Sequence, residues 1–259
     1  MKSFSKKVWV ITLNTFKEAV RDRILYSIVF FALLILALST VMDVVTIGQR
    51  SKIIKDMGLA SISIFGALIA IFVGIGLVYK EIDKRTIFTI VSKPVTRYQF
   101  ILGKYFGLVL TILVEVLAMG TIFFALVYYT SGQIDPKLFA ALGLTFLELM
   151  VICAVAIFFS SFSTPILSGM FTLGIYVIGH MTRDLYEFSA NFEGTSLEVI
   201  FKSLYYVFPN LDNFNIRAQA VHGLYIDPKY FLYSVLYGFL YIALLLFVSS
   251  IIFTKRDFK

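Results

Sequence analysis

Residues 149–182 read LMVICAVAIFFSSFSTPILSGMFTLGIYVIGHMT and contain no Asp, Glu, Lys or Arg. A helix needs only about 20 apolar residues to cross a bilayer core about 30 Å thick, so this stretch is long enough for two spans. The polar step from Ser160 to Pro165 divides it, because a hydroxyl residue followed by proline is typical of a helix start. We therefore predict an all-α integral membrane protein with two spans, 136–160 and 165–181, that meet at this step.

The rest of the chain has the same character. Hydrophobic residues make up 59% of it and charged residues 15%, against about 25% charged in soluble domains. The single cysteine, Cys153, cannot form an internal disulfide. The net charge of +7 is therefore interpreted through its placement along a membrane protein, and we expect no nucleic-acid partner.

We predict one transmembrane domain over residues 1–259, with six spans. A capping box from Thr96 to Gln99 opens the third span, and Asp-Pro steps at Asp135 and Asp227 open the fourth and sixth. The expected parts are an interfacial helix at 1–23, spans at 24–45, 57–79, 97–129, 136–160, 165–181 and 228–254, a short helix at 83–94 and an external segment at 182–227.

With six spans both termini lie on one side of the membrane. Fifteen of the 23 Lys and Arg residues fall on that side. Because basic residues favour the cytoplasmic side, we predict a multi-pass protein of a prokaryotic cytoplasmic (inner) membrane with both termini in the cytoplasm. The first apolar run is too long for a signal peptide, and no small-residue cleavage site follows it.

Besides the loop between the second and third spans, two segments outside the spans are amphipathic. Before the first span, Trp9, Leu13, Phe16 and Val20 recur at helical spacing, which predicts a helix in the cytoplasmic interface; the alternative is a charged flank of the first span. In the external segment, a capping box from Thr195 to Glu198 opens a helix of about 12 residues, too short to cross the bilayer.

The connection between the second and third spans is the only long cytoplasmic loop. Asp83 can cap a short helix that Pro94 ends. Apolar and basic side chains would lie beside each other on that helix, which would make it a docking element; the alternative is a solvated loop with ordinary positive charge. The candidate docking residues are Asp83, Lys84, Arg85, Ile87, Ile90 and Val91.

The chain carries no recognisable catalytic, nucleotide or metal site. No glycine-rich loop ends in Gly-Lys-Ser or Gly-Lys-Thr, so ATP is not expected to bind by that route. The two histidines, His180 and His222, are far apart in the sequence, and we expect His180 to be an interfacial side chain. We predict that the chain is not an enzyme and binds no metal or cofactor itself.

Two carboxyls lie within predicted spans, Glu115 in the third and Glu148 in the fourth. A charge at the bilayer centre costs about 2.5–3.5 kcal/mol on insertion scales, so both should face protein or water. They could line a transport path or hold a proton, or they could tie helices together. We favour the second interpretation, because adjacent antiparallel spans could pair the two residues directly. Gly103 and Gly107 also allow close helix approach, although such spacing is common.

Several motifs resemble one known family. The segment NTFKEAVRDR at 14–23 resembles the N-terminal helix of ABC-2-type permeases of ABC transporters, and most of all the nitrous-oxide-reductase maturation permeases. EIDKRT at 81–86 with KPVTR at 93–97 is similar to that family's loop between spans two and three. FPNLD at 208–212 and the serine-rich turn at 160–165 also look like family features.

The resemblance implies an exporter permease that dimerises, as a homodimer or with a second permease, on two copies of a separate ATPase, which would bind ATP and Mg. It implies that the short helix at 83–94 is a coupling helix inserted into the ATPase. It also implies that the first, second and fifth spans line the path and that the external helices close it. Two alternatives remain, an ATP-independent secondary transporter and an integral-membrane enzyme of lipid metabolism. A secondary transporter would be expected to show internal repeats, and the sequence has no clear ones. An enzyme of lipid metabolism would need clustered acids or metal ligands, which the sequence also lacks.

Overall fold

A computed structural model describes residues 2–41, 50–83, 96–192 and 194–255 of the chain. All regular elements within these residues are helices, so the predicted all-α class is confirmed. The helices are α1 (Lys2–Val20), α2 (Arg23–Val41), α3 (Arg50–Asp83), α5 (Arg97–Ser131), α6 (Pro136–Ser160), α7 (Pro165–Ser189), the 3-10 turn η2 (Ala190–Phe192), α8 (Ser196–Val207), the 3-10 turn η3 (Leu211–Phe214), α9 (Arg217–His222) and α10 (Pro228–Lys255).

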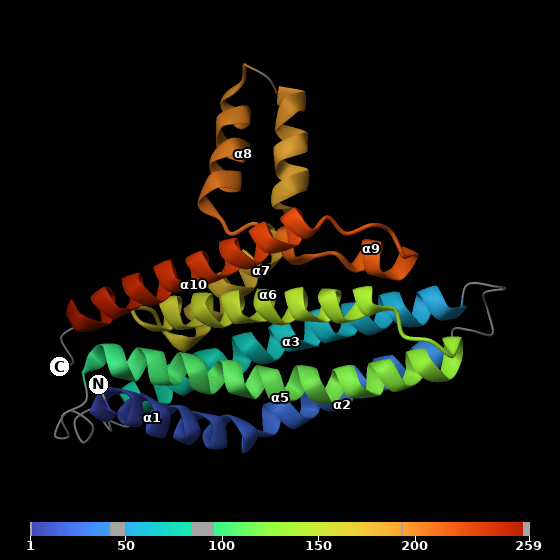
Figure 1. Ribbon diagram of the computed structural model, residues 1–259. Helices are drawn as coiled ribbons and strands as arrows, with labels where there is room; N and C mark the ends of the chain where they lie inside the picture. Colours follow the sequence, from blue (N-terminus) through green and yellow to red (C-terminus); the bar gives the residue numbers. More distant parts are fainter. Residues whose placement is uncertain (1, 42–49, 84–95, 193, 256–259) are drawn as a thin grey trace.

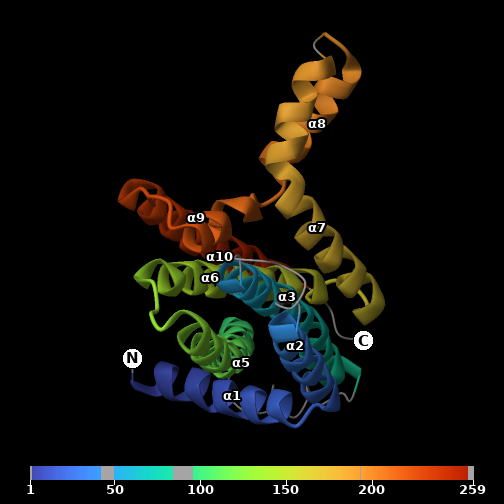
Figure 2. The same ribbon diagram turned by 90° about the vertical axis from the view of Figure 1, so that its right-hand side faces the viewer.

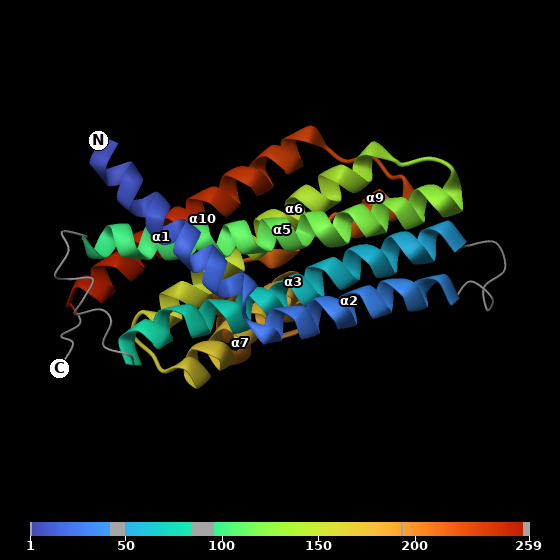
Figure 3. The same cartoon turned by 90° about the horizontal axis from the view of Figure 1, so that it is seen from below.

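Helices α2, α3, α5, α6 and α10 run side by side as an elongated bundle (Figures 1 and 3). Helix α1 begins and α10 ends at one end of this bundle, where α3 also ends and α5 begins (Figure 1). The described chain thus begins and ends at the same end of the bundle (Figure 1), while the side of the membrane on which both termini lie stays a prediction.

Five helices in the described part of the chain are long and apolar enough to cross a membrane: α3, α5, α6, α7 and α10. The predicted first span corresponds to α2, which has 19 residues and lies against α3. The structure therefore bears out a multi-pass membrane architecture, while the count of six spans stays a prediction.

The helix starts follow the local signals in the sequence. The Thr96 side chain accepts a hydrogen bond from the Gln99 backbone N–H, and the Gln99 side chain accepts one from the Thr96 N–H, which forms the predicted capping box. Asp135 caps α6 through the Lys137 N–H at 2.9 Å. The predicted box at α8 is wrong, because Thr195 makes no cap bond and Glu198 instead accepts from the Gly194 N–H at 2.8 Å.

The two spans of the charge-free stretch have different surroundings. Helix α6 lies inside the bundle, where 61% of an 18-residue apolar segment of the helix is buried. In α7 only 22% of the corresponding segment is buried. Helix α7 crosses the bundle steeply, and with α8 it forms a hairpin that stands away from the other helices (Figures 1 and 2). Aromatic pairs join the hairpin, with ring centroids 5.6 Å apart for Phe188–Phe201 and 4.9 Å apart for Tyr186–Tyr205.

Helix α1 packs obliquely across α5 (Figure 3) at the Gly103–Gly107 pair. A Cβ at Gly103 would lie 2.6 Å from the Ile11 Cβ, and a Cβ at Gly107 would lie 2.5 Å from the Thr15 Cβ. The glycine spacing that looked unspecific in the sequence is therefore a close helix contact. Fully buried Lys104 lies between these glycines in the sequence, and its Nζ is 3.8 Å from Glu18 Oε2. The position of α1 in the cytoplasmic interface stays a prediction.

Candidate functional site

The main polar cluster inside the described bundle is centred on Glu148 of α6, which is 2% exposed. Its Oε1 accepts a hydrogen bond from the Ser63 hydroxyl of α3 at 3.4 Å. The same oxygen lies 3.3 Å from the His180 Nε2 of α7. One carboxyl thus connects three helices that are far apart in the sequence. The expected position of His180 at the membrane interface stays a prediction.

The hydrogen-bond partners of His180 define its chemistry. Its Nδ1 lies 3.0 Å from the Tyr176 carbonyl, which can only accept, so Nδ1 carries a hydrogen. The contact between Nε2 and Glu148 Oε1 is then a hydrogen bond when one proton lies between them. That proton is either on an imidazolium facing a carboxylate or on a carboxyl facing a neutral imidazole. In either arrangement the contact ties α7 to α6 inside the bundle.

A close backbone contact fixes the position of this pair. A Cβ at Gly179, the neighbour of His180, would lie 2.7 Å from the Leu211 Cγ and 2.9 Å from the Pro209 carbonyl oxygen. The Tyr176 and His180 ring centroids are 4.6 Å apart. Glycine at position 179 therefore allows α7 to pack against η3 and sets the depth at which the imidazole meets Glu148.

Helix α9 is tied to α3 by a second polar contact on the same side of the bundle. Arg217 Nε lies 2.9 Å from Asp56 Oδ1, and both side chains are partly exposed. Ion pairs this exposed contribute little to stability, about 0–1 kcal/mol. The contact therefore orients α9 against α3 more than it stabilises the fold.

Glu115 of α5 is also buried, with 5% of its surface exposed. Neither of its carboxyl oxygens has a hydrogen-bond partner among the described residues. The predicted direct pairing of Glu115 with Glu148 is therefore wrong. The reason is rotational, because α6 directs Glu148 toward α3 and α7 and not toward α5.

Helix α7 buries small and polar residues and exposes large apolar ones. Its buried residues are Ser168, Thr172, Gly179, Thr182 and Ser189. Its exposed side chains include Ile166, Met170, Leu173, Val177 and Met181. A stripe of small residues allows close packing on the bundle, as in other membrane helices. The apolar face is left for lipid or for another protein.

A comparison with protein families finds a match over nearly the whole chain. The model of the ABC-2 family transporter protein matches residues 9–257. The chain belongs to the ABC-2 transporter family. It is thus a membrane protein and a permease of an ABC transporter, which confirms the resemblance seen in the sequence. No curated protein matches the chain. The closer likeness to the nitrous-oxide-reductase maturation permeases stays a prediction.

The docking residues expected in this ABC-2 permease lie at the edge of what the structure describes. Helix α3 continues through Asp83, the residue expected to start the short helix. Lys84, Arg85, Ile87, Ile90 and Val91 lie outside the described residues. Their role as a coupling helix is therefore a proposal.

The start of α5, which follows this connection, makes a contact with α10 that the sequence did not predict. Arg97, the first residue of α5, donates from Nη1 to the carbonyls of Phe253 and Thr254, each at 2.8 Å. These carbonyls belong to the last turn of α10, where backbone acceptors lack helical partners. A stacked ring pair, Phe100–Phe253 at 5.6 Å, supports the same contact. The start of α5 and the end of α10 therefore form one unit in the permease.

No group of three or more His, Cys, Asp or Glu side chains in the described residues could hold a metal ion. The sequence predicted that Glu148 is a buried polar residue, but it did not predict the partners Ser63 and His180. The one available signal was an ionisable side chain in a charge-free stretch, because such a residue needs a polar partner.

Proposed function

We propose that the chain is the permease subunit of an ATP-binding cassette exporter that moves a substrate across the cytoplasmic membrane. The observation that supports this most is the family match over residues 9–257. It favours the exporter interpretation over the ATP-independent transporter and the lipid-metabolism enzyme. Since the sequence carries no phosphate-binding loop, the energy must come from a separate ATPase, which would bind the ATP and Mg.

The connection between α3 and α5 is the proposed contact with that ATPase. Ile87, Ile90 and Val91 would insert as an apolar anchor, and Lys84 and Arg85 would pair with acidic residues at its rim. Burying three such side chains supplies about 4–8 kcal/mol before ordering costs. Charge pairs at the rim would give specificity more than affinity.

The geometry around this connection suits the transmission of force. Motion of the docked segment would reach α5 directly, and it would reach α10 through the Arg97 bonds to Phe253 and Thr254. Helix α1 would follow α5, because the two pack closely at Gly103 and Gly107. A movement applied at one connection would therefore displace three helices together.

We propose that two permease copies form a homodimer on two ATPase subunits. The exposed apolar face of α7 is the surface offered for the second copy, since this helix has the lowest buried share of the five candidate spans among the described residues. The hairpin of α7 and α8 would then lie over the outer side of the path. Both termini would be cytoplasmic, so cysteine at the exposed Tyr225 should react with an impermeant reagent from outside, while cysteine at Phe4 should not.

The two carboxyls in the spans, Glu148 and Glu115, would have different roles. Glu148 ties helices together through Ser63 and His180. Glu115 lacks such partners among the described residues, which favours a role in the path or in holding a proton. Glu115→Leu should then leave expression and thermal stability unchanged or improved and abolish transport. Full transport by this variant would make Glu115 an inert core residue.

The proposal is tested by co-purification with the ATPase and by its hydrolysis rate in lipid. Membranes that hold both subunits should yield a complex in which each permease copy accompanies one ATPase copy. A permease that transports at an undiminished rate in vesicles without ATP would contradict the exporter function.

A further inference from the structure

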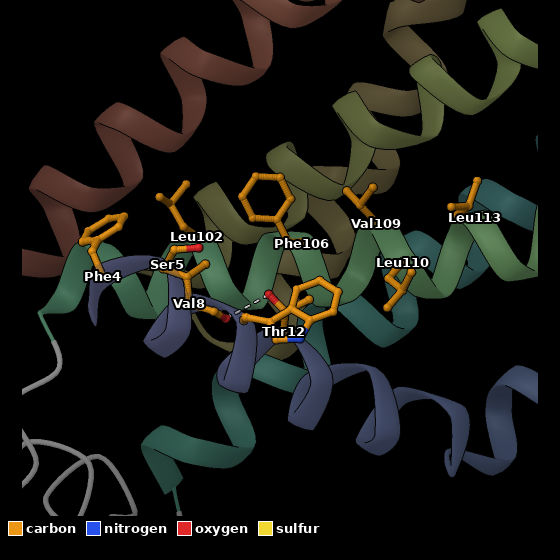
Figure 4. A pocket seen from close by; sticks show the side chains of 10 residues that line it. Phe4, Ser5, Val8, Thr12, Leu102, Phe106, Val109, Leu110 and Leu113 are labelled. Carbon is orange, nitrogen blue, oxygen red and sulfur yellow. Dashed lines mark hydrogen bonds between the residues drawn. The ribbon is translucent and has the colours of Figure 1, made fainter. Parts of the chain in front are cut away.

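Helices α1 and α5 enclose an apolar groove on one side of the bundle (Figure 4). Its volume is about 530 Å³. The groove runs from Phe4, near the start of α1, along α5 as far as Leu113 (Figure 4). Its lining includes Val8 and Trp9 of α1 and Phe106 and Leu110 of α5.

Polar groups are few in the groove, and they all come from α1. Of its lining side chains only Ser5 and Thr12 carry a hydroxyl. The Thr12 hydroxyl donates to the Val8 carbonyl at 3.0 Å, so it is used within α1. Ser5 lies beside Phe4, opposite the Leu113 end (Figure 4). A ligand that matches this lining is apolar along its length and polar at one end.

The polar end is also positively charged. Lys6 follows Ser5 and is exposed. It precedes Trp9 by three residues, so the two share a helix face. Within α1 itself the first acidic residue is Glu18, about three turns beyond Lys6.

We propose that the groove binds one acyl chain of an anionic phospholipid, with the lipid phosphate held by Lys6 and the Ser5 hydroxyl. A methylene chain can lie along an open apolar groove of about 530 Å³. A lysine near a membrane surface attracts anionic headgroups in preference to zwitterionic ones. The site is independent of ATP-driven transport and would fix α1 on α5 at a defined depth in the membrane.

The chain carries its own probe for this site. Trp9 is its single tryptophan, it lines the groove and it is 57% exposed. Its fluorescence can therefore be measured in the full chain, in nanodiscs that contain phospholipids brominated on the acyl chain. Brominated phosphatidylglycerol and brominated phosphatidylcholine are compared at equal mole fraction, because bromine quenches tryptophan only at short range.

Brominated phosphatidylglycerol should quench Trp9 at a lower mole fraction than brominated phosphatidylcholine. Lys6→Gln should reduce this preference by about fivefold. Val8→Phe, or Leu110→Phe from the α5 side, should fill the groove and reduce quenching by both lipids. The matched control is Leu173→Phe, which fills a second apolar groove of about 470 Å³ between α3 and α7 and should change nothing.

Equal quenching of the native chain by the two lipids would overturn the proposal. So would quenching that Val8→Phe and Leu110→Phe leave unchanged in variants with native helix content. Weak quenching by both lipids would show that protein covers the groove, which would also overturn it.

Discussion

The His180 imidazole on α7 lies 3.3 Å from the Glu148 carboxyl on α6. This contact joins the least buried candidate span among the described residues to a helix inside the bundle. The buried residues of α7 are all Ser, Thr or Gly, and the partly buried His180 supplies a polar link from α7 to the interior of the bundle. The position of α7, and with it the hairpin, therefore depends on this contact.

Removing either partner should destabilise the protein. Glu148→Ala leaves the His180 Nε2 and the Ser63 hydroxyl without an acceptor, and a lost buried partner costs about 1–3 kcal/mol. His180→Ala should cost a similar amount, and the double variant should cost clearly less than the sum. Thermal unfolding in one detergent measures all three. The control is the exposed Arg183–Glu187 pair at 3.2 Å, whose coupling should be about 0.3–0.5 kcal/mol. Additive costs at Glu148 and His180 would contradict the pairing.

Close packing of α1 on α5 predicts that Gly103 tolerates no side chain. Gly103→Ala places a methyl 2.6 Å from the Ile11 Cβ, so α1 must shift, at a cost of about 1–3 kcal/mol. Hydrogen exchange of the α1 amides should accelerate. Gly143→Ala on α6 meets nothing within 4 Å and should stabilise the helix by about 0.5–1 kcal/mol. If both variants behave alike, the glycine contact is not tight.

The start of α8 should loosen in acid. A hydrogen bond from Lys202 at 2.6 Å, and then the Gly194 N–H at 2.8 Å, hold the pKa of Glu198 below its ordinary value of 4.5. A lowered pKa gives stability that is complete above the ordinary value and is lost as pH falls through the lowered one. Protection of the Gly194 amide, corrected for intrinsic exchange, should therefore drop below about pH 4.5. Glu198→Gln should remove this pH dependence; if the drop persists in that variant, another group causes it.

Local signals in the sequence predicted local structure well. The capping box at Thr96 and the Asp135-Pro136 step formed as expected, because each depends on residues within one helical turn. The all-α fold and the two spans of the charge-free stretch followed from composition and length.

Tertiary relationships were not accessible in the same way. The residues of α6 and α7 in the charge-free stretch both predict membrane spans, yet one helix is inside the bundle and the other mostly outside. The partner of Glu148 lies 32 residues away at His180, and the packing partner of Gly103 lies at Ile11. Pairings of this kind depend on helix rotation and crossing angle, which hydropathy does not encode.

The central claim, that an ATPase drives this permease through the connection between α3 and α5, is tested most directly at Ile87 and Val91. The variant with Ile87→Asp and Val91→Asp puts two charges into the proposed apolar anchor. A matched control, Leu224→Asp with Tyr225→Asp, places the same charges on exposed positions between α9 and α10. The measurement is the amount of ATPase that co-purifies with the permease, together with its transport rate in vesicles. We predict that the Ile87–Val91 variant inserts normally, loses most of the ATPase and does not transport, while the Leu224–Tyr225 control keeps the ATPase. A variant that retains the ATPase and transports at the native rate would contradict the account.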